Sequence, residues 1–346
     1  MWEYILYLFL RNAIEIFFVV FVLLNITTFF LYVIDKRKAE KNKWRISEFT
    51  LILFTLMCGA VGAYFGMRVA RHKTKKKKFK IAVAISFIFT LIVMIHIAHS
   101  LTLDRIINYV EIEFRSENWP SELNGYRIAF ITDKHNIEDE TMRKIANELN
   151  EREINLLLLG GDFHYSVYEN TLREIAKINT TDGIFGVDGN HDYCATSLFA
   201  AKRQHEITPL DNSGVQIHNG FYLAGVQDLW IRNPNIEKAI ADANENDFIL
   251  LITHNPDVSM IQPTAGIDLI LAGHTHGGHV TFFGYPAFLL LRNITDYGTR
   301  FNRGFNHSAD GVPVFTSVGL SSNAISPRAF ARPEVIIFTM SGETKN

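Results

Sequence analysis

The sequence predicts a two-part protein of the α/β class, with membrane helices at residues 1–100 and a helix-covered, two-sheet domain at residues 101–346. The distribution of charged residues supports two parts. Residues 1–100 carry 15 Lys/Arg against 5 Asp/Glu and are basic, whereas the remainder carries 19 against 31 and is acidic. The hydropathy pattern changes between the same two parts, since long apolar runs come first and short strand-like runs ending in Asp, His or Asn come later. A length of 346 residues suits about two domains.

Three long apolar runs occupy the first part, at Ala13–Ile34, Phe49–Val69 and Ile81–Ala98. Each reaches or approaches the ~20 residues that a membrane-spanning helix needs. Gly62 and Gly66 in the middle run form a small-xxx-small pair, which favours close packing against a neighbouring helix. The sequence therefore predicts a multi-pass membrane domain with two or three transmembrane helices.

Basic loops separate these runs and constrain their orientation. Lys36–Arg45 holds 6 Lys/Arg and Arg68–Lys80 holds 8, and both are expected on the cytoplasmic side. Successive loops of three full spans lie on opposite sides, so either the more basic second loop prevails or the middle run is a re-entrant hairpin. Both alternatives place residue 101 onward outside the cytoplasm. The polar residues Glu15 and Asn25 in the first run are expected to face the bundle or an interface.

The segment from about residue 30 to about residue 80 resembles a small bacterial membrane-protein family of unknown function. The resemblance implies no activity, and the basic residues are interpreted as topology signals or contacts to anionic lipid head groups. The segments that carry it are Asp35-Lys36-Arg37-Lys38-Ala39, Trp44-Arg45-Ile46, Gly62-Ala63, Gly66-Met67 and Arg71-His72-Lys73-Thr74-Lys75.

The second part begins with strands that alternate with helices, which is typical of parallel βαβ units. The strands expected here are Val110–Phe114, Arg127–Thr132, Ile154–Leu159 and Ile184–Val187, and the helices are Glu138–Arg152, Tyr168–Ile178 and Ala195–His205.

Later elements are mainly strands, and Asn219-Gly220 between two of them is the strongest hairpin signal in the chain. The order of βαβ units followed by hairpin-like strands predicts a mixed two-sheet core covered by helices. The elements expected are a helix at Ile236–Asn244 and strands at Val215–His218, Phe221–Val226, Phe248–Ile252, Ile267–Ala272, Val280–Phe283, Val314–Val318 and Val335–Met340.

Five of the strand-like runs end in ligand-type residues. Open α/β sheets bind ligands at the carboxyl ends of their strands, so these turns are expected to form one site. Their oxygen and nitrogen donors suit Zn, Mn or Fe, and a carboxylate can bridge two ions held ~4 Å apart. The turns are Asp133-Lys134-His135, Gly161-Asp162, Gly189-Asn190-His191-Asp192, Thr253-His254-Asn255 and Gly273-His274-Thr275-His276-Gly277-Gly278.

The order Asp-x-His, Gly-Asp, Gly-Asn-His-Asp, His and Gly-His-x-His over residues of about 125–340 resembles the calcineurin-like metallophosphoesterase superfamily. The resemblance implies a four-layer αββα sandwich, two divalent metal ions and hydrolysis of a phosphoester or pyrophosphate bond by a metal-bridged hydroxide. His191 would be the acid for the leaving oxygen, and Asp192 would orient its imidazole. The implied ligands are Asp133, His135 and His276 for one ion, Asn190, His254 and His274 for the other, and Asp162 as the bridge.

The substrate implied by the resemblance is lipid-linked. Gly273–Gly278, Val318–Leu320 and Arg332–Glu334 resemble the membrane-attached bacterial branch, which includes enzymes that cleave UDP-diacylglucosamine-type and other lipid-linked phosphoesters. The apolar stretch Thr281–Leu291 is either a core strand with a buried connection or a flap that contacts lipid through Phe288, Leu289 and Leu290.

Two other functions compete with a phosphoesterase. A non-catalytic membrane scaffold would be expected to have lost ligands, whereas all seven are present. A nuclease would be expected to have a basic footprint, whereas the second part is acidic, so we expect no nucleic-acid partner. With only Cys58 and Cys194, the chain has no disulfide framework or cysteine-type zinc site.

Overall fold

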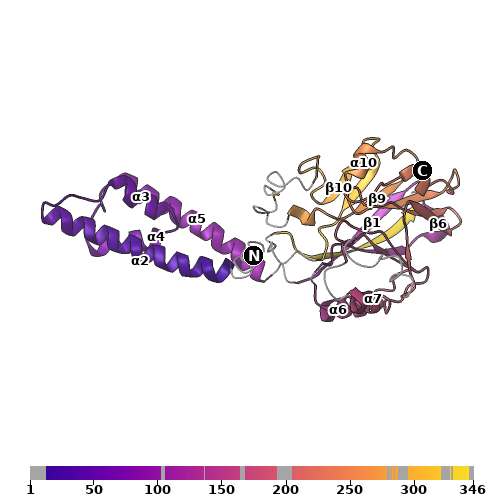
Figure 1. Ribbon diagram of the computed structural model, residues 1–346, viewed down its shortest axis with the longest axis horizontal. Coiled ribbons are helices and arrows are strands. Elements are labelled where there is room, and N and C mark those ends of the chain that lie inside the picture. The colour runs from indigo at the N-terminus through magenta and orange to yellow at the C-terminus, as the bar shows by residue number, and fades with distance from the viewer. Residues whose placement is uncertain are drawn as a thin grey trace. The chain divides into compact units, whose positions relative to one another are not determined.

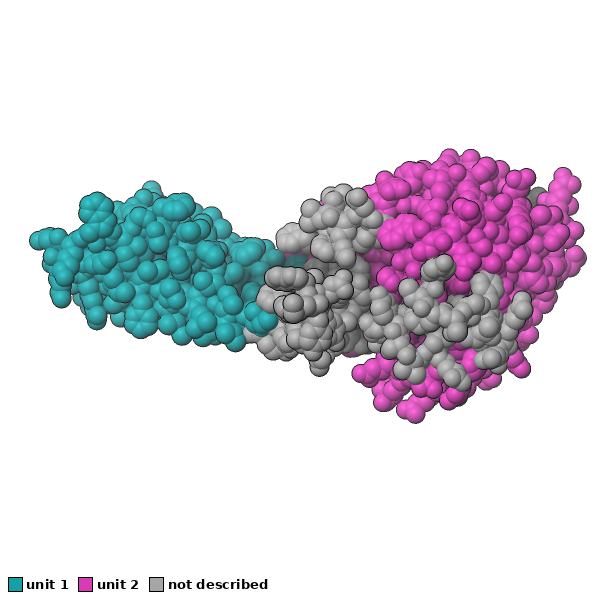
Figure 2. Space-filling view, viewed as in Figure 1, with its two compact units in different colours: residues 1–101 teal, residues 102–346 magenta. Residues whose placement is uncertain are grey.

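The computed structural model describes residues 13–102, 106–135, 137–163, 168–192, 205–278, 281, 283, 285–286, 295–320, 328 and 330–342. The chain forms two compact units, Met1–Leu101 and Thr102–Asn346, which we call the helical unit and the globular unit (Figure 1). Figure 2 colours the helical unit teal and the globular unit magenta.

The helical unit contains four described helices, two long and two short. The long helices α2 (Ala13–Glu40) and α5 (Lys77–Leu101) include the segments Ile16–Glu40 and Lys77–Ser100, which are long and apolar enough to cross a membrane. Between them lie α3 (Glu48–Leu56) and α4 (Ala60–Val69), of 9 and 10 residues.

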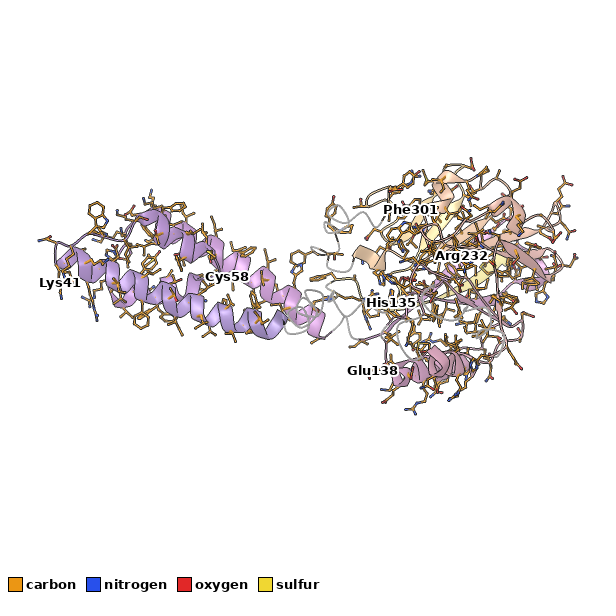
Figure 3. The ribbon with its side chains drawn as sticks, viewed as in Figure 1. Lys41, Cys58, His135, Glu138, Arg232 and Phe301 are labelled. Carbon is orange, nitrogen blue, oxygen red and sulfur yellow. The ribbon has the colours of Figure 1, made fainter. Side chains whose placement is uncertain are left out.

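The middle apolar run forms a helical hairpin, so it is not a third spanning helix. The chain turns at Cys58, whose φ is 64°. A side chain at the next residue, Gly59, would place its Cβ 2.2 Å from the carbonyl oxygen of Phe54, so the turn needs glycine there. Figure 3 shows Cys58 midway along the helical unit, whereas Lys41 lies at its end. The two short helices fit the re-entrant alternative that the basic loops left open, which stays a prediction about the membrane.

Helix α4 packs closely against α2 through glycine. A Cβ on Gly62 would lie 2.0 Å from the carbonyl oxygen of Asn25, and one on Gly66 would lie 3.0 Å from that of Phe29. The Asn25 side chain faces the bundle, as predicted. Its Nδ2 donates to the carbonyl of Cys58 (2.9 Å), and its Oδ1 accepts from the backbone N–H of Gly62 (2.9 Å). One asparagine in α2 therefore holds both sides of the hairpin turn.

The opposite end of the hairpin is held by ion pairs that join the two basic loops. The buried Asp35 carboxylate accepts from Arg45 (Nη2, 2.9 Å) in the first loop and contacts His72 (Nε2, 2.7 Å) in the second. Glu48 at the start of α3 pairs with Lys73 and Lys76, each at 2.6 Å, and also with Lys78. Both basic loops therefore lie at the same end of the helical unit.

The globular unit contains two six-stranded sheets. Most neighbouring strands are parallel, and the antiparallel pairs are β12 with β2, β10 with β11, and β6 with β7. In spatial order the first sheet is β1 (Asn108–Ser116), β12 (Glu334–Gly342), β2 (Tyr126–Ile131), β3 (Leu156–Leu159), β4 (Ile184–Gly186) and β5 (Ile207–Pro209). The second is β10 (Gly304–His307), β11 (Pro313–Thr316), β9 (Leu269–Ala272), β8 (Phe248–Ile252), β7 (Phe221–Gly225) and β6 (Ser213–His218).

Three apolar layers bind the elements into a four-layer αββα sandwich, which confirms the predicted fold class. Phe130 and Phe338 of the first sheet pack against residues of the second, including Leu250, to form the central layer. Helices α6 (Asp139–Glu151) and α7 (Tyr168–Ile175) cover the first sheet on its outer face. The short helices α9 (Ile236–Ala239) and α10 (Val258–Ile261) cover the second, and α6 and α10 lie on opposite sides (Figure 1).

Some local predictions differ from the structure. The helix expected at Ile236–Asn244 is the single turn of α9, because Ile240 already leaves helical geometry with ψ near 4°. Thr281 and Phe283 are not in a strand, so the strand expected at 280–283 is wrong at both of its described residues. Strands β5 and β10 were not predicted. The helix expected at 195–205 lies outside the described residues except for its last position.

Candidate metal centre

The predicted site residues come from strand ends of both sheets. Asp133 and His135 follow β2, Asp162 follows β3, and Asn190 follows β4 in the first sheet. His254 follows β8 in the second sheet, and His274 and His276 follow β9. The parallel strands of each sheet end at one edge, and the two edges meet where His274 contacts Asp133 and His254 contacts Gly160. The side chain of His135 is labelled in Figure 3.

Five of these residues have left-handed backbone conformations, which non-glycine residues seldom adopt. The φ angles are 53° at Asp133, 43° at His135, 59° at Asp162, 72° at His274 and 51° at His276. Such conformations persist only where the surrounding structure imposes them, and they cluster at functional sites. The chain here turns sharply after each strand and directs the side chain inward.

Glycines beside the site leave room for this packing. A Cβ on Gly189 would lie 2.2 Å from Oδ1 of Asp162. Gly319 has a φ of 68°, and its Cβ would lie 2.5 Å from that of Asp133. Glycine is therefore needed at both positions to bring the carboxylates to the centre.

The first group of converging donors is Asp133, His135 and His276, with one ligand atom of each within 4.8 Å of the others. Nε2 of His276 lies 3.1 Å from Nε2 of His135 and 3.4 Å from Oδ1 of Asp133. The other carboxylate oxygen of Asp133 accepts from the Thr132 hydroxyl and the backbone N–H of His274, each at 2.9 Å. These contacts fix the carboxylate and leave Oδ1 directed at the two imidazoles.

The second group surrounds Asp162. Nε2 of His254 lies 3.2 Å from Oδ2 of Asp162 and 3.2 Å from Nδ1 of His274. Nδ1 of His254 lies 2.8 Å from the carbonyl oxygen of Gly160, so it donates there and Nε2 is free to act as a ligand atom. Oδ2 of Asp162 also lies 3.5 Å from Nε2 of His135 in the first group. Asp162 therefore stands between the two groups, where a ligand shared by two cations would lie.

The residues present fit a pair of divalent cations. Among the described residues, buried Oδ1 atoms of Asp133 and Asn190 have no hydrogen-bond partner. Buried polar atoms in folded proteins nearly always have partners, and a cation would satisfy these oxygens. Carboxylate, amide and imidazole donors together suit Mn, Zn or Fe.

Electrostatics at the centre also favours a bound positive charge. Burial raises the pKa of Asp133 to about 6, and the nearby Asp162 carboxylate adds to this shift. Burial lowers the pKa of His135 to about 4, which keeps its imidazole neutral and able to coordinate. Burial alone would also lower the pKa of His254, but the carboxylates of Asp162, Asp133 and Asp228 raise it well above its ordinary value. A bound divalent cation would neutralise the same accumulation of negative charge.

His191 and Asp192 lie beside the centre. The backbone N–H of His191 donates to Oδ1 of Asp162 (2.8 Å), and its half-exposed ring lies 5.2 Å from that of His135. The Asp192 carboxylate accepts from three backbone N–H groups, those of Asp162 (2.7 Å), Gly189 (2.8 Å) and Phe163 (2.9 Å). That Asp192 orients the His191 imidazole stays a prediction, and the hydrogen bonds given above show that its carboxylate joins the loops after β3 and β4.

Sequence reasoning missed Asp228 and Trp230 in the loop after β7. Asp228 is 1% exposed, and its charge acts on both His254 and Asp162. The Trp230 ring stands edge-to-face on His274, with centroids 4.4 Å apart and an interplanar angle of 88°. The signal was available, because Gln227-Asp228 follows a strand-like run, but the preceding Asn219-Gly220 marked that run as a hairpin strand.

Comparison with known proteins agrees with this geometry. Residues 126–278 match the family model described as calcineurin-like phosphoesterase, and residues 25–79 match a model of proteins of unknown function. Within the globular unit, this segment is therefore similar to the calcineurin-like metallophosphoesterases, whose members use two divalent metal ions.

Several relatives are similar over more than half of this chain. An uncharacterized metallophosphoesterase of Helicobacter pylori is 29% identical over 60% of this chain, and the match spans 58% of that relative. YkuE, an uncharacterized metallophosphoesterase of Bacillus subtilis, is 23% identical over 68% of this chain and 85% of its own length. A zebrafish (Danio rerio) transmembrane protein with a metallophosphoesterase domain is 24% identical, covering 65% of this chain and 55% of its own.

A solved structure of a purple acid phosphatase from yellow lupin aligns at 9% identity with a TM-score of 0.34. That alignment covers 62% of this chain and 54% of the phosphatase, and it is too distant to bear on function.

Proposed function

We propose that this chain is a membrane-anchored, metal-dependent phosphoesterase. The observation that supports this most directly is the position of Asp162, whose Oδ2 lies 3.2 Å from Nε2 of His254 and 3.5 Å from Nε2 of His135. One carboxylate oxygen placed between two groups of donors is what a pair of bridged ions requires. We assign Asp133, His135 and His276 to one ion, Asn190, His254 and His274 to the other, and Asp162 to both.

Two divalent ions at such a centre supply Lewis acidity toward the phosphoryl oxygens and lower the pKa of water. The protein's own contribution is positioning. The Thr132 hydroxyl and the His274 N–H fix the Asp133 carboxylate, and the Gly160 carbonyl fixes the tautomer of His254. Because these partners hold the donors before any substrate arrives, the centre needs little reorganisation.

His191 is proposed as the acid for the leaving alcohol. Its N–H bond to Asp162 holds it at the centre, its ring lies 5.2 Å from that of His135, and the residue is only partly buried. A ring nitrogen would donate its proton to the leaving oxygen as the phosphorus–oxygen bond breaks. Asp192 acts as a positioning residue, because its three backbone partners hold the His191 loop against the loop of Asp162.

The substrate that we propose is a lipid-linked phosphoester, since the helical unit would keep the centre close to a membrane. Phe283 and Tyr285, which follow the turn of His276 in the chain, are 52% and 59% exposed, which is high for large aromatic rings. Phe288, Leu289 and Leu290, the residues expected to contact lipid, lie outside the described residues.

The experiment uses the full-length protein, purified in detergent and loaded with Mn, Zn or Fe. It should contain about two metal ions per chain and hydrolyse bis(4-nitrophenyl) phosphate. Chelation should abolish the activity, and re-addition of metal should restore it. A phosphodiester of diacylglycerol in mixed micelles should be turned over with a lower KM than its deacylated counterpart. A folded, metal-loaded protein that hydrolyses none of these esters would contradict the proposal.

A further inference from the structure

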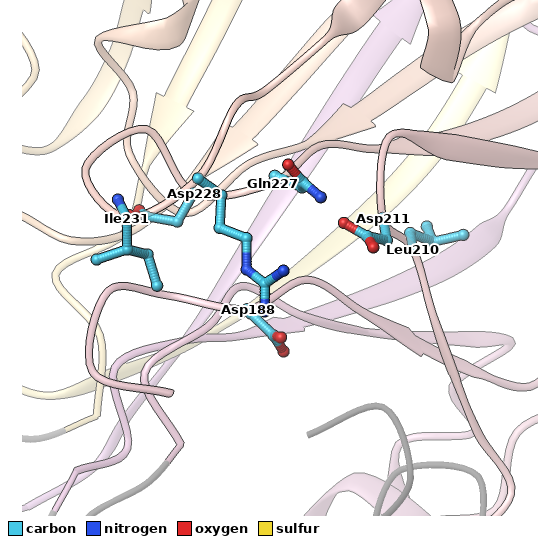
Figure 4. Close-up of a pocket in the computed structure, with 7 residues that line it drawn as sticks. Asp188, Leu210, Asp211, Gln227, Asp228 and Ile231 are labelled. Carbon is cyan, nitrogen blue, oxygen red and sulfur yellow. The ribbon is translucent and has the colours of Figure 1, made fainter. Parts of the chain in front are cut away.

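The segment Ser317–Leu320, which follows β11, borders the first group of metal donors, and all four of its residues are buried. A different segment borders the second group. There, Asp228 in the loop after β7 acts electrostatically on His254 and lines a small pocket together with Asp188 (Figure 4). The two groups are therefore supported by separate parts of the chain.

Two residues of the segment Ser317–Leu320 contact the turn that carries Asp133. Gly319 lies directly against this turn, because a Cβ at its position would be 2.5 Å from the Cβ of Asp133. The backbone N–H of Leu320 donates to the carbonyl oxygen of Thr132 (3.0 Å), and the Thr132 hydroxyl in turn donates to the Asp133 carboxylate. The position of this carboxylate therefore depends on where the segment lies.

Val318, in the same segment, packs against the turn that carries His276. A Cβ at Gly277, the residue after His276, would lie 2.5 Å from Cγ1 of Val318. Interiors that are packed this closely transmit small displacements to their neighbours. A shift of the segment would therefore displace His276 as well as Asp133, which are two of the three donors in the first group.

Two charged side chains from later in the chain hold Val318 from both sides. Oε1 of Glu334 accepts from the Val318 N–H (2.9 Å), and Nη2 of Arg328 donates to the Val318 carbonyl oxygen (2.7 Å). Glu334 also accepts from the Ser317 hydroxyl (3.1 Å), and Nη1 of Arg328 donates to the carbonyl oxygen of Ala331 (2.7 Å). Hydrogen bonds to charged groups are stronger than those between neutral groups, so these contacts fix the conformation of Val318.

Arg328 is close enough to the first group and to Glu334 to act on both. Burial is the main cause of the lowered pKa of His135, and the positive charge of Arg328 contributes to it. The same charge opposes the rise in the pKa of Glu334 that burial causes. Arg328 is 4% exposed, and buried charges are screened much less than exposed ones. The guanidinium therefore lies between the first group and the Glu334 carboxylate in electrostatic reach of each.

We propose that Glu334 and Arg328 are positioning residues for the first metal ion. By holding Val318 from both sides, they keep its segment in contact with the turns of Asp133 and His276. They act on the ion through these turns and not as ligands. This inference rests on the proposed function, because the first ion is assigned there.

The test measures metal binding by the full-length protein in detergent, using equilibrium dialysis against Mn²⁺. His276→Ala, which lacks a ligand of the first ion, identifies the binding step of that ion. Glu334→Ala and Arg328→Ala should weaken this step on the order of 10–100-fold, the range for residues that hold metal ligands in place. The step of the second ion should stay close to that of wild type. Ser317→Ala is a milder variant that removes one partner of Glu334, and it should weaken the first step severalfold.

Electron paramagnetic resonance of the same samples gives a spectroscopic signature. Two Mn²⁺ ions that share a bridging carboxylate are magnetically coupled, so wild type should show a coupled spectrum. Glu334→Ala should show the spectrum of a single bound Mn²⁺ at metal concentrations that fill both sites of wild type.

Conservative variants and a matched control separate positioning from a general loss of stability. Glu334→Gln should recover most of the affinity that Glu334→Ala loses, because an amide oxygen still accepts from the Val318 N–H. Arg328→Lys should recover little, since an ammonium lacks the planar fork that reaches two carbonyls. Ser308→Ala changes an equally buried serine in the turn before β11 and should leave both binding steps and the coupled spectrum unchanged.

The outcomes distinguish this inference from the proposed function. If wild type binds both ions but hydrolyses no phosphoester, while the first step is weakened in the variants, the proposed function fails and the positioning role stands. Full affinity for both ions in Glu334→Ala and Ser317→Ala would overturn the positioning role alone. Equal weakening of both steps would also overturn it. If the alanine variants of the two charged residues do not fold, Ser317→Ala against Ser308→Ala decides in the same way.

Discussion

Asp133, His135, Asp162, His274 and His276 adopt backbone conformations that cost on the order of 1–3 kcal/mol each in non-glycine residues. Their side chains converge on one centre, so the strain is concentrated where the proposed chemistry occurs. The assigned roles nevertheless differ from residue to residue, and that difference can be tested by substitution.

Asp162→Ala should abolish activity and deplete both metal ions, because its Oδ2 faces donors of both groups. His191→Ala should keep the metal content and reduce kcat by roughly 10²–10⁴, the range of general acid catalysis. Metal analysis and steady-state kinetics on the same preparations distinguish the two, and Asp242→Ala, at an exposed position, is the control. Loss of metal in His191→Ala with retention in Asp162→Ala would reverse the assignment of roles.

At the scale of elements, the hairpin of α3 and α4 depends on α2. Asn25 and Gly62 meet near the middle of the segment Ile16–Glu40, where the hairpin turn reaches α2. At the other end, Asp35 and Glu48 hold the two basic loops together. The hairpin is therefore attached to its neighbours at both of its ends.

Asn25→Leu should destabilise the helical unit, because it leaves the Cys58 carbonyl and the Gly62 N–H without their partner in an apolar setting. Side-chain hydrogen bonds between membrane helices contribute about 0.6 kcal/mol on average. Losing two of them should lower the Tm of the helical unit by a few degrees in detergent. The control is Ile26→Leu, a conservative change at an apolar residue that is 49% exposed. Equal Tm values for the two variants would show that Asn25 does not stabilise the hairpin.

At the scale of the whole molecule, the hairpin bears on the membrane topology. The ion pairs hold both basic loops at the same end of the helical unit, and we propose that Ile16–Glu40 and Lys77–Ser100 cross the membrane with the hairpin between them. Lys/Arg-rich loops favour the cytoplasm, so we propose that α5 leaves the cytoplasm and that the globular unit is extracytoplasmic.

Reporter fusions test this topology. A phosphatase reporter that is active only outside the cytoplasm, fused after Ser100, should be active, and a reporter that fluoresces only in the cytoplasm should be silent there. The same pair fused after Lys75, in the second basic loop, should give the opposite result. Activity of the phosphatase reporter at Lys75 would invert the proposed orientation.

The sequence by itself determined the fold class and the likeness to the calcineurin-like metallophosphoesterases, and it singled out residues that could bind metal. Short continuous apolar runs ending in Asp, His or Asn are a local signal, because burial of a strand and the polar turn at its end are both encoded in a few residues. The elements from Arg127 to Leu159 and the strand Phe248–Ile252 follow this rule, and their observed bounds differ by at most two residues.

Only the tertiary structure decided how distant segments combine. Hydropathy could not distinguish a third span from the hairpin, because the outcome depends on Asn25 reaching Cys58 across 33 residues. Nor could it place Asp228 and Trp230 beside His254 and His274, since β7 reads as a hairpin strand and meets the centre only through its parallel pairing with β8. Local pattern specifies which residues are available, whereas contacts between strands and helices far apart in the chain decide which of them meet.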